Sequence, residues 1–360
     1  MATVPLNDAH IALGAKMCPF AGWSMPIEYP TGTVAEHTAV RNAVGIFDVS
    51  HMGKVRIVGE GTLTFLNSVL TNDLNRIADG QAQYSMLCNE SGGVIDDLIV
   101  YRVSSDEVRI VPNAANAAEV VRVLGELSPA SVIVHDLHIE LGILAIQGPN
   151  SAEVVSALGL PSDIEYMSFV DATWQGQELS VCRTGYTGEH GYELIAPNSI
   201  LVALWTEALA VGEASGLIPC GLGSRDTLRT EMGYPLHGQD ISPEISPVMA
   251  KLNWAIGWDK PTFAGKDALA TQRAEKQGRT LWGLRALERG IPRSHMQVKR
   301  GEDVVGETTS GTFSPTLQQG IALALLDQDI HAGDQLVVDV RGRALNVEVV
   351  KPPFVQNHTK

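Results

Sequence analysis

The stretch YSMLCNESGGVIDDLIVYR, residues 84–102, indicates the fold of the region around it. Two apolar runs, at 84–88 and 94–101, flank a polar segment that ends in two glycines. A glycine-containing loop of this length between segments rich in strand-forming residues is typical of a β-hairpin. We therefore expect two antiparallel strands joined at 89–93.

The second of these strands carries two neighbouring acids, Asp96 and Asp97, between apolar residues. Successive side chains of a strand point to opposite faces of the sheet, so one carboxylate lies on each face. A buried, unpaired carboxylate is costly, and such a group pairs, shifts its pKa or meets a ligand that donates hydrogen bonds. The alternative is structural, with one Asp capping or pairing with an arginine and the other in solvent.

The order of predicted elements around the hairpin repeats along the chain. The first series is a strand at 54–59, a helix at 62–70, the two hairpin strands, a strand at 107–111, a helix at 116–127 and a strand at 131–137. The second series has strands at 141–147, 166–174, 178–182 and 192–195, and helices at 151–158 and 201–214. Both match the split βαβ, ferredoxin-like arrangement, in which an antiparallel sheet carries two helices on one face. The sequence thus predicts an α+β protein with two related halves.

The second series carries an unusual loop, RTGYTGEHGYEL at 183–194, whose three glycines let the backbone approach something closely. Glu193 lies two residues before Ile195 in the following strand and so shares its face. Further on, GLGSRD at 221–226 leads into a predicted helix, with Ser224 as its N-cap and Arg225 in its first turn. The helix dipole disfavours a cation there, so Arg225 needs an anionic or oxygen partner, for which Glu193 is a candidate.

Short β segments follow the polar boundary KQGR at 276–279. They lie at 281–286, 308–310, 321–326, 335–340 and 345–350. Such a series predicts a small all-β barrel or sandwich. Within it, residues 285–300 are rich in basic side chains, which suggests an anionic ligand or partner or, equally, a solvated face.

Composition excludes several classes of protein. Against 26 basic residues the chain has 41 acidic ones, a formal charge of -15 that argues against nucleic acid as a partner. No apolar run approaches the length of a membrane span, and the start MATVPLNDAH lacks the features of a signal peptide, so we expect a cytoplasmic protein without a membrane partner.

Resident cofactors are also not indicated. The four cysteines are far apart, without the C-x-x-C or histidine spacing of a zinc site, so we expect reduced thiols and no metal. The dinucleotide-binding motif G-x-G-x-x-G and the P-loop motif G-x-x-x-x-G-K-[ST] do not occur. Flavin, nicotinamide and ATP are therefore not the first cofactors to expect.

Several of these segments together resemble the T-protein family of the glycine cleavage system, over essentially the full length of the chain. The matching motifs are LGAKM at 13–17, FAGW at 20–23, FDVSHMG at 47–53, GGVIDD at 92–97, TGYTGEHGYE at 184–193, GLGSRD at 221–226, SGTFSP at 310–315 and PF at 353–354. The resemblance implies three domains around a central folate site, two of them discontinuous in sequence. We expect a folate-binding catalytic region at 1–278, with the first split βαβ unit at about 54–137, and a C-terminal β-barrel domain at 279–360.

The activity implied is that of an aminomethyltransferase. Such an enzyme moves the methylene carbon of an aminomethyl group, carried on the lipoyl arm of the partner H-protein, to the co-substrate tetrahydrofolate. The products are 5,10-methylenetetrahydrofolate, ammonia and dihydrolipoyl H-protein.

The resemblance also assigns residues to this chemistry. Asp97 matches the catalytic aspartate, expected to orient the folate and to stabilise developing positive charge. A reduced pterin presents adjacent donors that one carboxylate can accept, and Glu193 matches the residue in that role. Arg225 matches the arginine that completes pterin binding, and Asp96, on the other face, should matter much less for catalysis.

Further positions match residues that line or face the folate site. These are Met52, Tyr84, Asn113, Tyr186 and, in the C-terminal domain, Arg293. Simple core packing is the alternative role for Met52 and the two tyrosines. The stretch VQNHTK after Phe354 departs from the aromatic or basic residue with which the family often reaches the folate tail.

Two other functions are compatible with the same fold. One is a folate-dependent demethylase, whose oxidative versions carry a fused flavoprotein domain for which this chain has neither the length nor the dinucleotide loop. The other is a non-catalytic folate-binding factor of iron–sulfur assembly, marked by a K-G-C-x-x-G-Q-E segment. The nearest stretch here, EMGYPLHGQD at 231–240, lacks the Lys-Gly-Cys.

Overall fold

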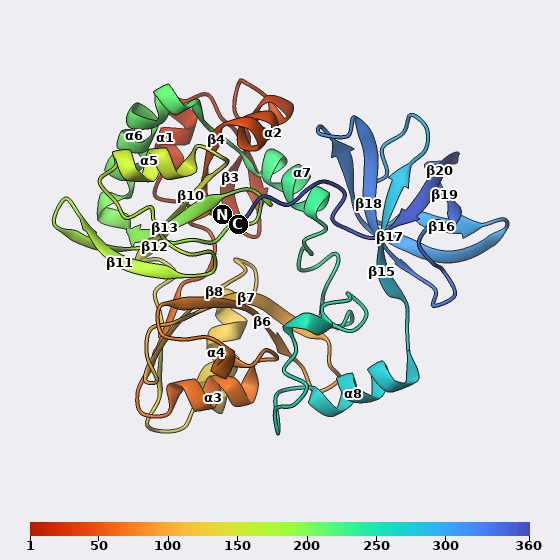
Figure 1. Cartoon of the computed structure of the whole chain (residues 1–360), viewed down its shortest axis with the longest axis horizontal. Helices are drawn as coiled ribbons and strands as arrows, with labels where there is room; N and C mark the ends of the chain where they lie inside the picture. Colours follow the sequence, from red (N-terminus) through yellow and green to blue (C-terminus); the bar gives the residue numbers. More distant parts are fainter.

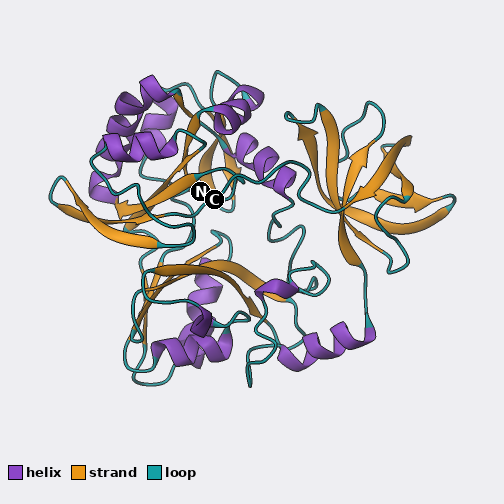
Figure 2. Ribbon diagram, viewed as in Figure 1, coloured by secondary structure: helices purple, strands orange, loops and turns teal.

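The computed structural model describes all 360 residues. Figure 1 shows two bodies built of a sheet and helices, and one barrel, placed around a shared centre where both chain ends also lie. In Figure 2 most helices of the two sheet-containing bodies lie on their outer sides, and the barrel consists of strands and loops. No helix is long and apolar enough to cross a bilayer.

An antiparallel sheet of five strands forms the first body. Its strands, in spatial order, are β6 (Gln81–Cys88), β7 (Val94–Arg102), β8 (Glu107–Pro112), β5 (Val55–Val58) and β9 (Ile133–Asp136). Helices α3 (Thr62–Val69) and α4 (Ala117–Leu127) cover one face, where Phe65 and Leu124 belong to the same apolar core as Leu98 and Val100 of β7. The predicted hairpin and the split βαβ order are therefore confirmed.

The second body has a sheet of six strands. In spatial order they are β11 (Phe169–Trp174), β12 (Gln177–Cys182), β13 (Gly191–Pro197), β10 (Leu141–Gln147), β4 (Val44–Asp48) and β14 (Leu217–Pro219). Helices α5 (Ser151–Ala157) and α6 (Asn198–Gly212) cover its outer face, where Trp205 packs in one core with Leu144 and Leu194.

The two sheets share one strand order. Each begins at an edge with a hairpin (β6 and β7, or β11 and β12), continues with β8 or β13, and then with the strand that opens the unit, β5 or β10. The next place belongs to β9 in the first sheet but to β4 in the second, and both pair antiparallel with their neighbour. The second sheet therefore contains one strand that precedes the first body in the sequence, β4, and other strands that follow it.

The N-terminal segment forms a small sheet beside helix α7 (Leu222–Met232). Its strands are β1 (Ala2–Thr3), β3 (Trp23–Glu28) and β2 (Lys16–Phe20), and two helices belong to the same segment, α1 (Asn7–Ala12) and α2 (Thr33–Asn42). Val4 and Met25 pack against Leu222 of α7. Glycine is required at position 221, because a Cβ there would lie 2.4 Å from the backbone of Ile27.

A closed barrel of six strands forms the third body. In order around the barrel they are β15 (Thr280–Ala286), β18 (Gln319–Leu326), β17 (Asp303–Ser314), β16 (Gln297–Arg300), β19 (Gln335–Val340) and β20 (Arg343–Val350). The sequence prediction missed β16, whose QVKR lacks the apolar alternation of a strand, and gave only 308–310 for the 12 residues of β17. Helix α8 (Lys266–Glu275) precedes β15, and three short 3-10 turns complete the elements: η1 (Leu74–Arg76), η2 (Glu213–Ser215) and η3 (Asn253–Ala255).

After β20 the chain returns to the centre of the molecule. The backbone N–H of Phe354 donates to the carbonyl of Glu231 at 2.7 Å, and that of His358 donates to the carbonyl of Gly188 at 2.8 Å. The carbonyl of Thr359 accepts from Nη2 of the buried Arg183 at 2.7 Å. The C-terminal segment is thereby attached to α7 and to the loop at 183–191.

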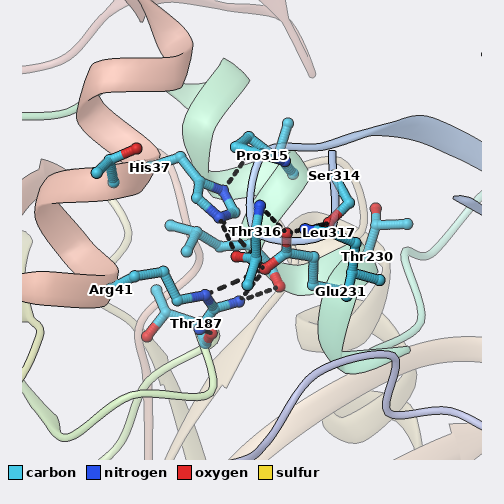
Figure 3. Close-up of polar contacts among 12 residues, drawn as sticks. His37, Arg41, Thr187, Thr230, Glu231, Ser314, Pro315, Thr316 and Leu317 are labelled. Atoms are coloured by element: carbon cyan, nitrogen blue, oxygen red, sulfur yellow. Dashed lines mark hydrogen bonds and ion pairs between the residues drawn. The ribbon is translucent and has the colours of Figure 1, made fainter. Parts of the chain in front are cut away.

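The buried carboxylate of Glu231, near the end of α7, joins the barrel to the rest of the molecule (Figure 3). Its Oε1 accepts from Ser314 Oγ at 2.5 Å and from the backbone N–H of Thr316 at 3.1 Å. Its Oε2 accepts from Thr316 Oγ1 at 2.9 Å and from Arg41 Nη2 at 2.8 Å, and lies 3.2 Å from His37 Nε2. One carboxylate therefore connects α2, α7 and the turn after β17.

The surroundings of Glu231 favour its charged form. Burial alone acts to raise the pKa of a carboxyl, but the hydrogen bond and charge of His37, with the Ser314 hydroxyl and Arg41, bring the pKa of Glu231 down to about 2. Because this folded-state pKa lies below the ordinary value, the stabilisation is complete above the ordinary carboxyl pKa and is lost as the pH falls toward 2.

We expect Glu231→Gln to lower the free energy of unfolding at pH 7 by about 1–3 kcal/mol, because the neutral amide binds Arg41 and His37 more weakly, whereas Arg41 keeps its ion pair with Glu189. Urea denaturation of both proteins measures the difference, which should shrink as the pH falls from about 4.5 toward 2. Glu140→Gln is the control, because Glu140 is exposed and its carboxylate makes no hydrogen bond or ion pair; its effect should stay within about 0.5 kcal/mol. Equal stability of the Glu231 variant and the wild type would contradict this role.

Candidate functional site

Two carboxylates, Asp97 of β7 and Glu193 of β13, lie on the faces of the two sheets that are opposite to α3 and α4 and to α5 and α6. Asp97 shares its side of β7 with Ile99 and Tyr101, and Glu193 shares its side of β13 with Ile195, as strand alternation predicted. Tyr101, Ile99 and Ile195 meet in one apolar cluster between the sheets. The sheets therefore face one another across this cluster and bring both acids to the centre of the molecule.

Both oxygens of Asp97 accept hydrogen bonds from side chains. The hydroxyl of Tyr84, on the paired strand β6, donates to Oδ2 at 3.0 Å. The amide Nδ2 of Asn113 donates to Oδ1 at 2.7 Å. The carboxylate is half-buried, so it is held in one orientation while one side stays accessible to a ligand.

Asp96 points to the other face and is fully buried. Its Oδ2 accepts from the backbone N–H of Asn113 at 2.9 Å, and its Oδ1 accepts from Asn113 Nδ2 at 2.9 Å and from Asn116 Nδ2 at 2.7 Å. Because Asn113 Nδ2 also donates to Asp97, one amide connects the two acids. The alternative, in which one Asp caps or pairs with an arginine and the other is in solvent, is wrong: neither forms an ion pair, Asp96 is buried and Asp97 is half-buried.

The two acids have raised pKa values. Burial raises the pKa of Asp97, and its hydrogen bonds to Tyr84 and Asn113 oppose that shift only in part. Burial together with the neighbouring charge of Asp97 raises the pKa of Asp96. Burial and the charge of Asp97 also raise the pKa of Tyr84, so its hydroxyl keeps its proton and remains a donor.

Glu193 has free acceptor capacity. Its only hydrogen bond comes from the hydroxyl of Thr184, whose oxygen also lies 3.1 Å from the hydroxyl of Tyr101. Thr184 uses Oε2, which leaves Oε1 without a partner. The carboxylate is half-buried and can accept further hydrogen bonds from a ligand.

Arg225 lies in the first turn of α7 without the partner that was expected. It makes no hydrogen bond to Glu193; its guanidinium lies 4.9 Å from the ring centroid of Tyr186, and its Nη1 is buried with no hydrogen-bond partner. Ser224 is also not the N-cap, because the helix starts at Leu222 and the Ser224 hydroxyl donates to Glu36. A buried guanidinium nitrogen without an acceptor is costly, so Arg225 has a free donor for an oxygen placed beside it.

Aromatic pairs border this group on two sides. Tyr84 stacks on the exposed Trp254 with ring centroids 5.4 Å apart, and Tyr186 stacks on Tyr234 at 5.7 Å. The hydroxyl of Tyr186 donates to the carbonyl of Pro235. Both predicted tyrosines are thus fixed by a stacked neighbour and a hydrogen bond.

The two remaining predicted residues, Met52 and Arg293, lie in different parts of the molecule. Met52 is half-buried and packs against the cluster of Phe47 and Ile143, next to Ile195. Arg293 is exposed, and its side chain makes no hydrogen bond or ion pair. The structure thus gives Met52 a place beside the inner face of the second sheet, and gives Arg293 a place on the barrel surface.

The basic stretch at 285–300 is largely neutralised by acids distant in sequence. The pairs are Arg285 with Glu348, His295 with Glu307, Lys299 with Asp339 and Arg300 with Asp329. These pairs favour a solvated face over the anion-binding alternative.

Sequence reasoning missed several residues of this group. They are Asn116, Thr184, Tyr234, His237 and Trp254. Thr184 lies in the glycine-rich loop that was singled out, whereas Trp254 lies in the short turn η3 and His237 in a loop, and neither segment has a periodic signal. No group of His, Cys, Asp or Glu is arranged to hold a metal ion, and the four cysteines are free thiols.

Two cavities lie away from this group. One of about 420 Å³ is lined by Tyr166 and residues of the C-terminal segment, and one of about 220 Å³ lies beside Trp23 and His138. Neither contains Asp97, Glu193 or Arg225. The central group therefore remains the candidate site because of its chemistry: acceptor oxygens, a guanidinium without a partner and flanking aromatic rings suit a planar ligand with hydrogen-bond donors and a carbonyl.

Family models, curated proteins and a solved structure all match this chain over nearly its full length. The family model described as the GCVT N-terminal domain matches residues 6–260, and that of the glycine cleavage T-protein C-terminal barrel domain matches residues 279–356. An aminomethyltransferase of Parafrankia sp. (strain EAN1pec) is 59% identical over 353 residues, covering 98% of this chain and 97% of that protein. One of Mycobacterium avium (strain 104) is 56% identical over 359 residues, covering 99% and 97%. The crystal structure of glycine cleavage system aminomethyltransferase T from Bartonella henselae has a TM-score of 0.94 and 32% identity, covering 99% of this chain and 98% of that one.

Proposed function

Since this chain belongs to the glycine cleavage T-protein family, we propose that the group around Asp97, Glu193 and Arg225 is its active site. The chain is an aminomethyltransferase of the glycine cleavage system. Its proposed substrates are the aminomethyl group on the dihydrolipoyl arm of a lipoylated H-protein, and tetrahydrofolate.

The proposed reaction breaks two bonds of one carbon and forms two others. The methylene carbon loses its bonds to the lipoyl sulfur and to the amine nitrogen, and gains bonds to two folate nitrogens. The two hydrogens lost by those nitrogens go to the departing amine, which leaves as ammonia, and to the sulfur, which becomes a thiol. Oxidation states are unchanged, so the reaction needs no redox cofactor such as flavin or nicotinamide.

The residues present fit a folate. Glu193 Oε1 has no partner, so it can accept from the adjacent amino and ring N–H donors of a pterin. The buried Nη1 of Arg225 also lacks a partner, and it can donate to the pterin carbonyl. When bound, a reduced folate supplies the two nitrogens that receive the carbon.

Asp97 is the proposed catalytic residue. Tyr84 and Asn113 hold its two oxygens in place, so its charge is oriented before substrates arrive. In a half-buried site a fixed negative charge stabilises positive charge that develops on a neighbouring carbon or nitrogen more effectively than water does. Tyr84, Asn113, Tyr186, Met52 and Arg293 are proposed to line or face the folate.

Each part of the chain has a proposed share in this function. Residues 1–278 form the catalytic region, with the first split βαβ unit at about 54–137 supplying Asp97. Residues 279–360 form a barrel domain that closes the site from the third side.

The observation that carries the proposal is that Asp97 and Glu193 lie on the facing sides of the two sheets and that Arg225, over the ring of Tyr186, has a buried nitrogen without a partner. The test supplies aminomethylated H-protein and tetrahydrofolate and measures ammonia release and methylenetetrahydrofolate formation. Formation of both products in equal amounts is expected. Folate binding without either product would instead favour a non-catalytic folate-binding protein, and methyl transfer from an N-methyl donor would favour a demethylase.

We expect Asp97→Asn to fold and to bind folate normally but to lose at least about a hundredfold in kcat, because a neutral amide no longer stabilises developing positive charge. Steady-state kinetics with calorimetric folate titration separates the two effects. Asp163→Asn, at an exposed aspartate without hydrogen bonds, is the control and should keep full activity. Activity of the Asp97 variant within about threefold of wild type would remove this residue from the mechanism.

We expect Glu193→Gln to weaken folate binding by about 1–3 kcal/mol, since the amide turns a donor pair toward the donors of the pterin. Isothermal titration calorimetry measures the change. Glu178→Gln, at an exposed glutamate of the adjacent strand β12, should bind folate as the wild type does. An unchanged affinity of the Glu193 variant would mean that the pterin binds elsewhere.

A further inference from the structure

The loop after α7 is packed tightly on the start of strand β7. The backbone N–H of Val94 donates to the carbonyl of Ser242 at 2.8 Å. A Cβ at Gly93 would lie 1.7 Å from the carbonyl oxygen of Pro243, so only glycine permits this approach. The loop therefore has a fixed position relative to the strand that carries Asp96 and Asp97.

His237 of this loop makes two hydrogen bonds with different partners. Its Nε2 lies 2.9 Å from the carbonyl oxygen of Val94, which can only accept, so Nε2 carries the hydrogen. Its Nδ1 lies 3.0 Å from Nδ2 of Asn116, which can only donate. The two partners together select the neutral tautomer with the hydrogen on Nε2.

Asn116 continues the chain of hydrogen bonds toward the active site. Its Nδ2 donates one hydrogen to His237 and the other to Oδ1 of Asp96 at 2.7 Å, so both amide hydrogens are used. The fully buried Asp96 then accepts from Asn113, whose amide reaches Oδ1 of Asp97. An unbroken series of side chains thus leads from His237 to the catalytic carboxylate.

We propose that His237 is a positioning residue for the reaction: through Asn116 and Asp96 it fixes the amide of Asn113 that orients Asp97. This inference rests on the proposed function of Asp97. It gives Asp96 a part in the site that strand alternation alone did not predict, because Asp96 holds the same amide from the opposite face. The sequence offered no signal for His237, because both of its partners come from segments more than a hundred residues earlier in the chain.

The alternative is that His237 only anchors its loop to Val94. Two substitutions separate these roles, because an Asn side chain places its amide near the position of Nδ1 and a Gln side chain places it near that of Nε2. His237→Asn keeps an acceptor for Asn116 and loses the donor to Val94. His237→Gln keeps the donor to Val94 and loses the acceptor for Asn116.

The experiment compares both variants with the wild type in the full reaction with aminomethylated H-protein and tetrahydrofolate. If His237 positions Asp97, His237→Gln loses roughly tenfold or more in kcat with unchanged KM values and unchanged thermal midpoint, and His237→Asn retains kcat. If His237 is only an anchor, His237→Asn loses thermal stability and His237→Gln is fully active, which overturns the proposal. An inactive wild type would instead refute the proposed function.

A second measurement needs no substrate. In protein with ¹⁵N-labelled histidine, the His237 resonances, assigned with the His237→Asn variant, should show a protonated Nε2 and an unprotonated Nδ1. Protonation at Nδ1 in the free protein would break the hydrogen-bond chain at Asn116 and overturn the proposal.

Discussion

The position of α7 depends on one buried charge. Glu231 ties the end of this helix to Arg41 of α2 and to Ser314 and Thr316 after β17, and the C-terminal segment binds its carbonyl. The same helix carries Arg225 at its other end, directed to Tyr186. The contacts that attach the barrel therefore also determine where the guanidinium lies relative to the two sheets. Helix α7 thus serves both the stability of the molecule and its proposed function.

The second constraint is that the two sheets turn toward each other the faces opposite to α3 and α4 in the first body and to α5 and α6 in the second. Strand alternation then sends apolar residues such as Leu98 and Leu194 to the helices, and sends Asp97 and Glu193 to the opposite faces. Two such faces turned toward each other enclose a small apolar cluster with acids at its border. This arrangement of the sheets by itself places charged groups in weakly polar surroundings, without any specialised motif. Such surroundings suit the stabilisation of charge during a transfer reaction.

Local patterns in the sequence were sufficient to predict the hairpin, the two βαβ series, the barrel, and the faces of Asp97 and Glu193, because periodicity and turn residues are local signals. Features set by distant partners were not predictable in this way. Strand β16 is stabilised by pairing with β17 and β19 and not by its own residues, and the basic stretch is neutralised by Asp329, Asp339 and Glu348. Arg225 and His237 likewise find their surroundings only through the fold: the helix pattern and the family resemblance pointed to Arg225 but not to its neighbour Tyr186, and nothing pointed to His237.

The place of β4 in the second sheet has a consequence for how the molecule forms. Leu144 of β10 pairs with Asp48 of β4, and the whole first body lies between them in the sequence. The pairings of the first body connect segments that are closer in the chain, so the entropy lost in closing its loops is smaller. We therefore expect the first body to acquire its structure early and to shorten, once folded, the path between β4 and β10. The inserted body would then act as an internal scaffold that speeds the completion of the second sheet, which it interrupts in the sequence.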